Sequence, residues 1–293
     1  MKLDEIIDEN IQSLNLKNVI IFYDENHEIL IDKLFTNLKS NSIFLNTHNI
    51  SFEFFKNYLN KISDDSMIVL LLPLFKNLNI DNHEFYKILM TLEITGKYLI
   101  NISAGIDNVW DKIVLQNYNE LLAKLIDYSS IKEISNISND YLLRLRENKL
   151  YKLEDKNGTE LFFEIDKIHI ENFPLTAENR VIQIPHGEVF IVPKMNSING
   201  KVILKKKYDT HVFNIKNDYT NIEMSSIKGK FPVCEIGFGT NSCIPMIYNL
   251  PYFEKKLGTY HLGFGGNESF GGKYSFDYHF DIVNPIKYEI HEV

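Results

Sequence analysis

Hydrophobic positions in the first half of the chain fall into short apolar runs that alternate with helical patterns. The run between the first two apolar segments, from about residue 28 to 38, has the period of an amphipathic helix. Strands that alternate with helices are typical of an open parallel sheet covered by helices, so we expect an α/β domain over residues 1–150. The apolar runs predict strands at 18–23, 42–46, 67–72 and 98–102.

After Tyr151 the pattern changes to short alternating runs bounded by turn residues. Residues 151–293 are therefore predicted to form a mainly β domain of the α+β type. Glycines cluster here at 237–239 and 263–266, and a glycine inside a strand weakens it, so a local reason is expected. The expected strands are 161–165, 181–184, 188–192, 201–204, 233–238, 260–264 and 278–283.

Composition and charge narrow the class of protein. The formal charge is −8 and 44% of residues are hydrophobic, which is typical of a globular protein and excludes a basic nucleic-acid-binding surface. The most apolar stretch, Met67 to Phe75, is far shorter than the roughly 20 residues of a membrane span. The N-terminal segment is acidic and has no signal-peptide pattern, so we expect a cytoplasmic protein.

Two motifs in the second half place a metal-ligand residue beside glycines. Side chains alternate across a strand, so positions i, i+2 and i+4 line one face. In residues 234–239, Glu235 shares a face with two glycines, while Cys234, Ile236 and Phe238 are expected to pack on the other. In residues 260–265, His261 has the same arrangement. Each strand thus offers one donor atom and open space beside it for a metal and its substrate.

A third motif adds Asp277, His279 and Asp281, which project from one face of a predicted strand. His279 and Asp281 are expected to bind an ion, and Asp277 to accept the other ring N–H of His279. Glu188 and His186 share a face in a fourth segment. A mixed imidazole and carboxylate set suits zinc, cobalt, manganese or iron. Each residue by itself is more often a solvent-facing polar group, so the hypothesis rests on their conjunction.

Residues 184–193, 235–241, 257–265 and 279–281 resemble, in order, motifs of the thermophilic metallo-aminopeptidases, the aminopeptidase T and S group. The Asn157-Gly158-Thr159 turn is also similar to one in that family. The resemblance implies a homodimer whose β-rich domain binds two zinc, cobalt or manganese ions and hydrolyses an amide or peptide bond of a small substrate. The implied metal ligands are Glu188, Glu235, His261, His279 and Asp281.

Two positions depart from the family pattern. The family's tyrosine, seven positions beyond the histidine, is Glu268 here, and His186 stands where the family has glycine. Both residues are candidates for proton transfer. The chain is also shorter than typical members, mostly in its first half.

Two alternatives stay open. The same superfamily includes a non-haem iron dioxygenase that opens dihydroxypyridine rings, and the chain resembles it at His261, His279 and Asp281, a possible facial triad for one Fe(II) ion. A catalytically silent binding or maturation protein of the same fold is the other alternative. Glu188 and Glu235 favour two metals and hydrolysis, because a bridging carboxylate serves a pair of ions better than one.

Overall fold

The computed structural model divides the chain into two compact units. They comprise residues Met1–Glu133 with Glu171–His186, and Ile134–Ile170 with Gly187–Val293. These bounds differ from the single boundary predicted at residue 150, because the chain returns to the first unit at Glu171 and leaves it again after His186. The structure describes residues 3–24, 31, 34–35, 37–72, 74, 96–103, 128–177, 180–205, 209–224, 227–246, 252–276 and 278–293.

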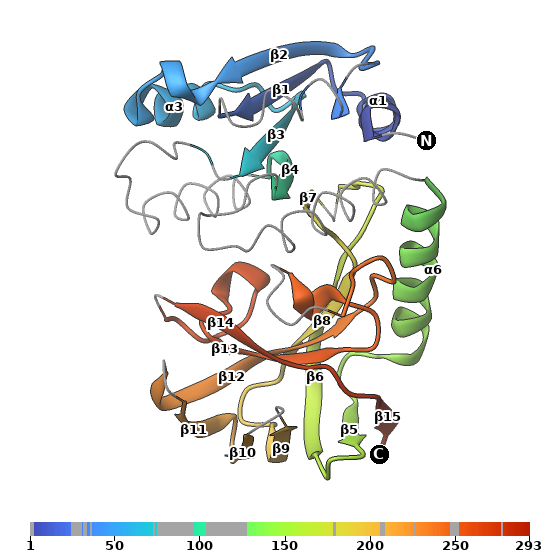
Figure 1. The fold of residues 1–293 in the computed structure, drawn as a ribbon, viewed down its shortest axis with the longest axis vertical. Helices are drawn as coiled ribbons and strands as arrows, with labels where there is room; N and C mark the ends of the chain where they lie inside the picture. Colours follow the sequence, from blue (N-terminus) through green and yellow to red (C-terminus); the bar gives the residue numbers. More distant parts are fainter. Residues whose placement is uncertain are drawn as a thin grey trace. The chain divides into compact units, whose positions relative to one another are not determined.

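The first unit contains a parallel sheet with the strand order β2-β1-β3-β4-β7 (Figure 1). The four strands predicted from the apolar runs are confirmed. β3 is buried over all but its last residue, as expected for a strand inside a parallel sheet. The strands are β1 (Asn18–Tyr23), β2 (Asn41–Asn46), β3 (Ser66–Leu72), β4 (Tyr98–Ser103) and β7 (Val181–Ile184), and the helices are α1 (Leu3–Ser13), η2 (Thr47–Asn49) and α3 (Phe52–Leu59). The helix predicted at 28–38 lies largely outside the described residues.

β7 belongs to a different sheet from the one expected. Residues 181–184 were predicted among the strands of the β-rich domain, but they extend the parallel sheet, where Leu99 pairs with Val181 and Ile102 with Ile184. Four alternating residues identify a strand without identifying its partner. The partner is decided by which sheet edge the chain reaches.

The second unit is built around an antiparallel sheet with the path β10-β9-β6-β8-β12-β13-β14, to which β11, β5 and β15 are added (Figure 1). The predicted β-rich character is confirmed, although β5, β10, β11 and β15 were not among the expected strands. The strands are β5 (Leu150–Asp155), β6 (Glu160–Glu171), β8 (Glu188–Pro193), β9 (Asn199–Lys205), β10 (Thr210–Ile215), β11 (Tyr219–Glu223), β12 (Lys228–Gly239), β13 (Tyr260–Gly265), β14 (His279–Asn284) and β15 (Tyr288–Glu292). The described helices are η3 (Phe253–Lys255), η4 (Glu268–Phe270) and α6 (Tyr128–Arg144), of which the residues from Ile134 onward belong to this unit. Among the helices of the described ranges, none combines the length and apolarity that crossing a membrane requires.

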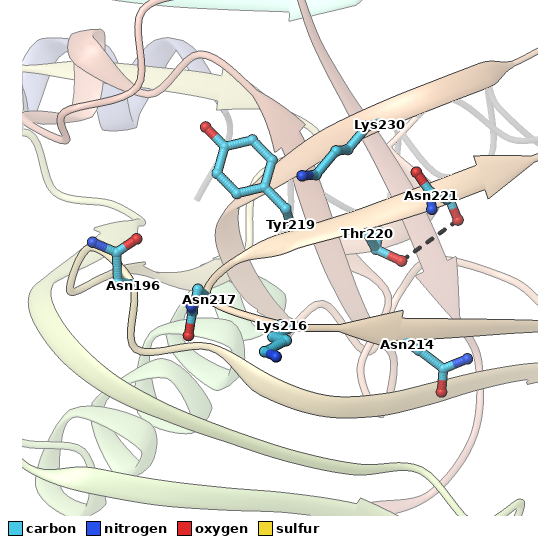
Figure 2. A pocket seen from close by; sticks show the side chains of 8 residues that line it. All are labelled: Asn196, Asn214, Lys216, Asn217, Tyr219, Thr220, Asn221 and Lys230. Carbon is cyan, nitrogen blue, oxygen red and sulfur yellow. Dashed lines mark hydrogen bonds between the residues drawn. The ribbon is translucent and has the colours of Figure 1, made fainter.

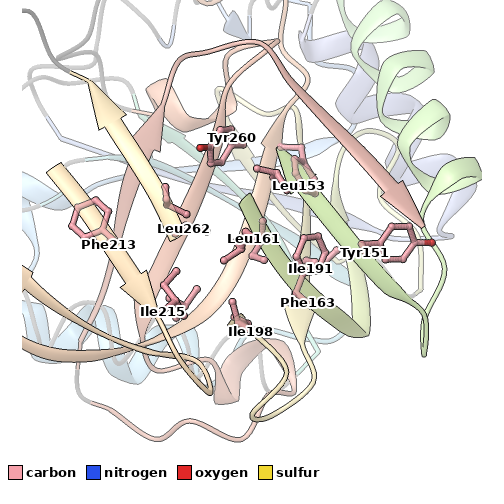
Figure 3. Packing of buried hydrophobic residues seen from close by; sticks show 14 of the residues in the cluster. Tyr151, Leu153, Leu161, Phe163, Ile191, Ile198, Phe213, Ile215, Tyr260 and Leu262 are labelled. Atoms are coloured by element: carbon pink, nitrogen blue, oxygen red, sulfur yellow. The ribbon is translucent and has the colours of Figure 1, made fainter. Parts of the chain in front are cut away.

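One face of this sheet forms the hydrophobic core of the unit. Ile236 and Phe238 of β12 and Leu262 and Phe264 of β13 are buried in it. Figure 3 shows side chains from β5, β6, β8, β10 and β13 that meet in the same cluster. The burial pins the register of these strands, because a slip by one residue would turn every apolar side chain to the opposite face.

A bulge in β12 changes the predicted alternation at Cys234. The register with β13 shifts between Val233 and Glu235, so that Val233 joins the core. Cys234 was expected to pack with Ile236, but its Sγ instead lies 3.7 Å from Nδ1 of His279. An extra residue in one strand reverses the facing of the residues before it, and no pattern in the sequence marks its position.

A buried polar network joins the β5–β6 hairpin to β13 and β14. Tyr260 Oη donates a hydrogen bond to Asp155 Oδ2 (2.8 Å), and Asn284 Nδ2 donates to Tyr260 Oη (2.6 Å). Asp155 Oδ1 accepts the backbone N–H groups of Asn157 (2.8 Å) and Thr159 (3.2 Å) in the turn. This is the Asn157-Gly158-Thr159 turn noted in the sequence. Asp155 therefore fixes the hairpin and the strand that carries His261.

We expect Asp155→Ala to lower the free energy of unfolding by about 2–4 kcal/mol, because Tyr260, Asn284 and two backbone N–H groups lose their shared acceptor. Denaturant unfolding followed by circular dichroism measures the change. Asp140→Ala, on an exposed position of α6, is the matched control and should change stability by less than about 0.5 kcal/mol. Equal losses in the two variants would contradict a structural role for the network.

Candidate metal centre

The candidate donors lie on four neighbouring strands, β8, β12, β13 and β14, on the sheet face opposite the core. Strand register places every donor beside a glycine of an adjacent strand. The pairs are Glu188 with Gly239, His261 with Gly237, Glu235 and Asp281 with Gly263, and His279 with Gly265. Donors and bare backbone therefore alternate across the sheet as well as along it.

Gly237 and Gly263 are required because donor side chains occupy the space of their missing Cβ atoms. A Cβ on Gly237 would lie 2.0 Å from His261 Cε1 and 2.6 Å from Glu188 Oε1. A Cβ on Gly263 would lie 2.8 Å from Glu235 Cβ and 2.9 Å from His279 Cε1. This crowding explains why glycine stands at positions 237 and 263, inside strands that glycine weakens.

The five donors form two groups that share one residue. In each group, one donor atom of every member lies within 4.8 Å of the others. Glu235 belongs to both: its Oε1 lies 3.1 Å from His261 Nε2, and its Oε2 lies 3.7 Å from His279 Nε2. The buried group is Glu188, Glu235 and His261, and the open group is Glu235, His279 and Asp281.

The two groups differ in their access to solvent. The side chains of Glu188, Glu235 and His261 are at most 8% exposed, whereas those of His279 and Asp281 are 29% and 30% exposed. Glu188 Oε1 lies 3.0 Å from His261 Nε2, and Asp281 Oδ1 lies 3.4 Å from His279 Nε2. A small molecule therefore reaches the cluster from the side of the open group.

A backbone carbonyl orients His279. Its Nδ1 lies 2.9 Å from the carbonyl oxygen of Gly266 and donates to it, which turns Nε2 toward Glu235 and Asp281. Asp277 was predicted to have this orienting role, but it lies outside the described residues.

Electrostatics give the cluster a strong affinity for positive charge. Burial opposes protonation of His261, yet Glu188 and Asp281 raise its pKa well above the usual value. Burial likewise opposes protonation of His279, but its contacts with Asp281 and Cys234 raise its pKa to about 12. Burial raises the pKa of Glu235. In the absence of metal, protons neutralise the carboxylates; metal ions replace protons in such sites.

Hydrogen bonding within the buried group is incomplete, which fits a cation. His261 Nε2 faces two carboxylate oxygens and carries at most one N–H. Within the described ranges, Glu188 Oε1 and His261 Nδ1 have no hydrogen-bond partner. A cation placed among Glu188, Glu235 and His261 would have a donor atom from each of the three. The oxygen and imidazole donors of both groups suit zinc, cobalt, manganese or iron.

Two charged residues of η3 near the cluster were missed in the sequence. η3 contacts β12 and β14, and Thr259 Oγ1 donates to the carbonyl oxygen of Glu254 (2.8 Å). Burial raises the pKa of Glu254 to about 7; the charge of Lys255 opposes this rise, and Glu188 and Asp281 add to it. Lys255 is itself buried. In the sequence, Glu254 and Lys255 are a charged pair between apolar residues and the histidine motif. Such a pair is equally typical of a surface loop, so it does not mark a site.

The two predicted proton-transfer residues belong to neither group of donors. Glu268 is exposed at the start of η4. His186 lies in the first unit, where it is buried in an edge-to-face contact with Phe173, with ring centroids 5.1 Å apart.

Two other polar features of the second unit are separate from the five donors. A pocket of about 450 Å³ is lined by residues of β10, β11, β12 and their turns, including Lys216, Tyr219 and Lys230 (Figure 2). None of the donors lines this pocket. Glu154, Glu289 and His291 form a further group on the exposed β5–β15 pair, where Lys152 neutralises Glu154 at 2.8 Å.

Comparison with known proteins connects the chain to two enzymes by structure. No protein-family model and no curated protein matches its sequence. The solved structure of 2,5-dihydroxypyridine dioxygenase from Pseudomonas putida KT2440 is similar, with a TM-score of 0.62 and 13% identity over 99% of this chain and 93% of that one. AmpT from Thermus thermophilus, an aminopeptidase T, is similar with a TM-score of 0.50 and 13% identity over 98% and 94% of the two chains.

The chain shares the fold of these two enzymes. At 13% identity the likeness concerns the fold alone. The two enzymes catalyse different reactions.

We expect Glu254→Gln to stabilise the metal-free protein increasingly as pH rises from about 4.5 to about 7. The folded-state pKa of Glu254 is raised from 4.5 to about 7, so its ionisation across this window destabilises the fold, and glutamine removes that penalty. The difference in unfolding free energy between variant and parent should grow by up to about 3 kcal/mol across the window. Denaturant unfolding at a series of pH values in a chelator measures it.

Glu223→Gln, at the exposed end of β11, is the control and should show no such trend. If the difference in unfolding free energy between Glu254→Gln and the parent does not vary with pH, the carboxylate of Glu254 is solvated in the folded parent protein.

Proposed function

We propose that the protein is a metal-dependent hydrolase that cleaves an amide or peptide bond of a small substrate, as the aminopeptidase T and S group does. The observation that carries this proposal is the position of Glu235 between two groups of donors, with one carboxylate oxygen toward each. A carboxylate so placed is suited to bridge two ions. Pairs of bridged divalent ions are a recurring feature of aminopeptidases and other hydrolases.

Charge balance also favours two ions. Glu188, Glu235 and Asp281 together carry three negative charges when ionised, and the two histidines are neutral as ligands. Two divalent ions bring four positive charges, which leaves one in excess for the oxygen of a hydroxide or a polarised carbonyl. One divalent ion leaves the cluster with one negative charge in excess, in a place where burial penalises it.

Each residue has a distinct part in the proposed reaction. Glu188 and His261 would hold one ion, His279 and Asp281 the other, and Glu235 both. The ions would polarise the scissile carbonyl and lower the pKa of a water molecule toward neutrality. Glu254, whose pKa lies near 7, is suited to accept a proton at its carboxylate and return it to the leaving amine. Glu254 replaces Glu268 and His186 as the leading proton-transfer candidate.

A mononuclear iron dioxygenase is the second candidate. The dioxygenase structure has the higher TM-score of the two similar enzymes, at 0.62. The facial triad expected for that reaction is His261, His279 and Asp281. Across the described part of the chain, however, the compact group around His279 and Asp281 is completed by Glu235 and not by His261. The number of bound ions separates the two candidates.

We expect the purified chain to retain two zinc, cobalt or manganese ions after dialysis, measured by mass spectrometry of the metals. Glu235→Ala should lose both ions because each group loses a donor, whereas Glu188→Ala and Asp281→Ala should each retain one. Glu289→Ala, from the exposed group on β15, is the control and should retain two. One ferrous ion after anaerobic purification would favour the dioxygenase, and no metal would favour the catalytically silent protein.

We expect the metal-loaded protein to release amino acids from dipeptides and aminoacyl anilides. His279→Ala should lower kcat/KM by about 10³-fold or more, because the open group loses its only imidazole. His211→Ala is the control, since His211 is a half-buried histidine of β10 that belongs to neither group of donors, and it should leave the rate unchanged. Oxygen consumption with a dihydroxypyridine, and no release of amino acids, would contradict the hydrolase assignment.

A further inference from the structure

Three aromatic side chains form a group beside the open side of the donor cluster. Phe190 and Phe270 pack edge to face with ring centroids 5.2 Å apart, and His169 stacks on Phe190 at 4.9 Å. The ring of Phe270 also contacts that of His279, at 5.8 Å and an angle of 83°. Phe190, Phe270 and His169 are only half-buried. Partly exposed apolar rings thus adjoin a candidate metal ligand.

The register of β8 places Phe190 on the same face as the donors. Phe190 follows Glu188 by two residues on β8, and the intervening Val189 packs in the core. Phe190 also pairs with Gly237, the glycine that makes space for His261 and Glu188. Side chains two apart in a strand share a face, so Phe190 projects beside the buried group of donors.

η4 and β6 fix the second ring. His169 Nε2 lies 2.9 Å from the carbonyl oxygen of Phe270, the last residue of η4, and donates to it. Burial lowers the pKa of His169, so the imidazole is neutral at pH 7 and adds no charge to the group. The result is a surface of three uncharged rings next to His279.

We propose that Phe190 and Phe270 form a specificity wall for the substrate of the donor cluster. The polar end of the substrate binds at the five donors, and an apolar group, best an aromatic ring, packs against the two phenylalanines. Small-molecule sites commonly combine a few convergent polar groups with aromatic walls. This inference rests on the proposed function, in which the apolar group is the side chain of the residue whose amide bond is cleaved.

The wall is tested with two metal-chelating probes that differ by one phenyl group. Calorimetry of the zinc-loaded full chain compares phenylacetohydroxamate with acetohydroxamate. We expect the phenyl probe to bind at least about tenfold more tightly, because a ring packed on two others gains both apolar burial and aromatic contact. In Phe190→Ala and in Phe270→Ala, the ratio should fall to within about twofold, with zinc content and acetohydroxamate affinity unchanged.

Phe162→Ala is the control, since Phe162 is a half-buried aromatic residue of β6 that packs with Lys152. It should keep the ratio of the parent protein. Equal affinities for the two probes in the zinc-loaded parent would overturn the wall and leave the metal centre standing. Failure to bind zinc would overturn the proposed function and the wall together. Loss of zinc in both Phe190→Ala and Phe190→Leu would show a structural role for the ring and overturn the wall.

Discussion

The main physical constraint on the second unit is that three carboxylates and two imidazoles lie close together on one face of a β-sheet. Like charges at about 4 Å repel by roughly 4 kcal/mol in a partly buried environment, so the cluster needs protonated histidines or a cation to bring its three carboxylates together. It is held by the opposite face of the same strands, where Ile236, Phe238, Leu262 and Phe264 are buried. The free energy of that burial fixes the register, and the register fixes the donors.

The close approach of the donors also requires glycines on the adjacent strands. Adjacent strands lie too close for a donor and another side chain to occupy opposing positions when the donor points across the sheet. Gly237 and Gly263 remove that obstacle, and the donors fill the space above them. The low propensity of glycine for strands is therefore a cost that the core offsets and that the site requires. The Asp155 network adds support on the core side, because Tyr260 directly precedes His261.

The two groups of donors make the two ends of the cluster differ in their exposure to solvent. The group around Glu188 is buried and the group around Asp281 is open, with Glu235 common to both. One end is thus suited to hold an ion firmly, and the other to admit a substrate. Phe190, Phe270 and Glu254 stand near this arrangement without being donors. Under the proposed function, they are the residues that adapt a fold shared with enzymes of different chemistry to a particular substrate.

The sequence by itself determined which residues share a face, because alternation along a strand is a local property. Glu235, His261, His279 and Asp281 were identified in this way, together with the parallel sheet of the first unit. Tertiary structure alone decided the partner of β7, the bulge that turns Cys234 toward His279, the approach of Glu254 and Lys255, and the sharing of Glu235 between two groups. Each of these depends on segments far apart in the chain. Their pairing is set by the packing of the whole sheet, and no local pattern of residues encodes it.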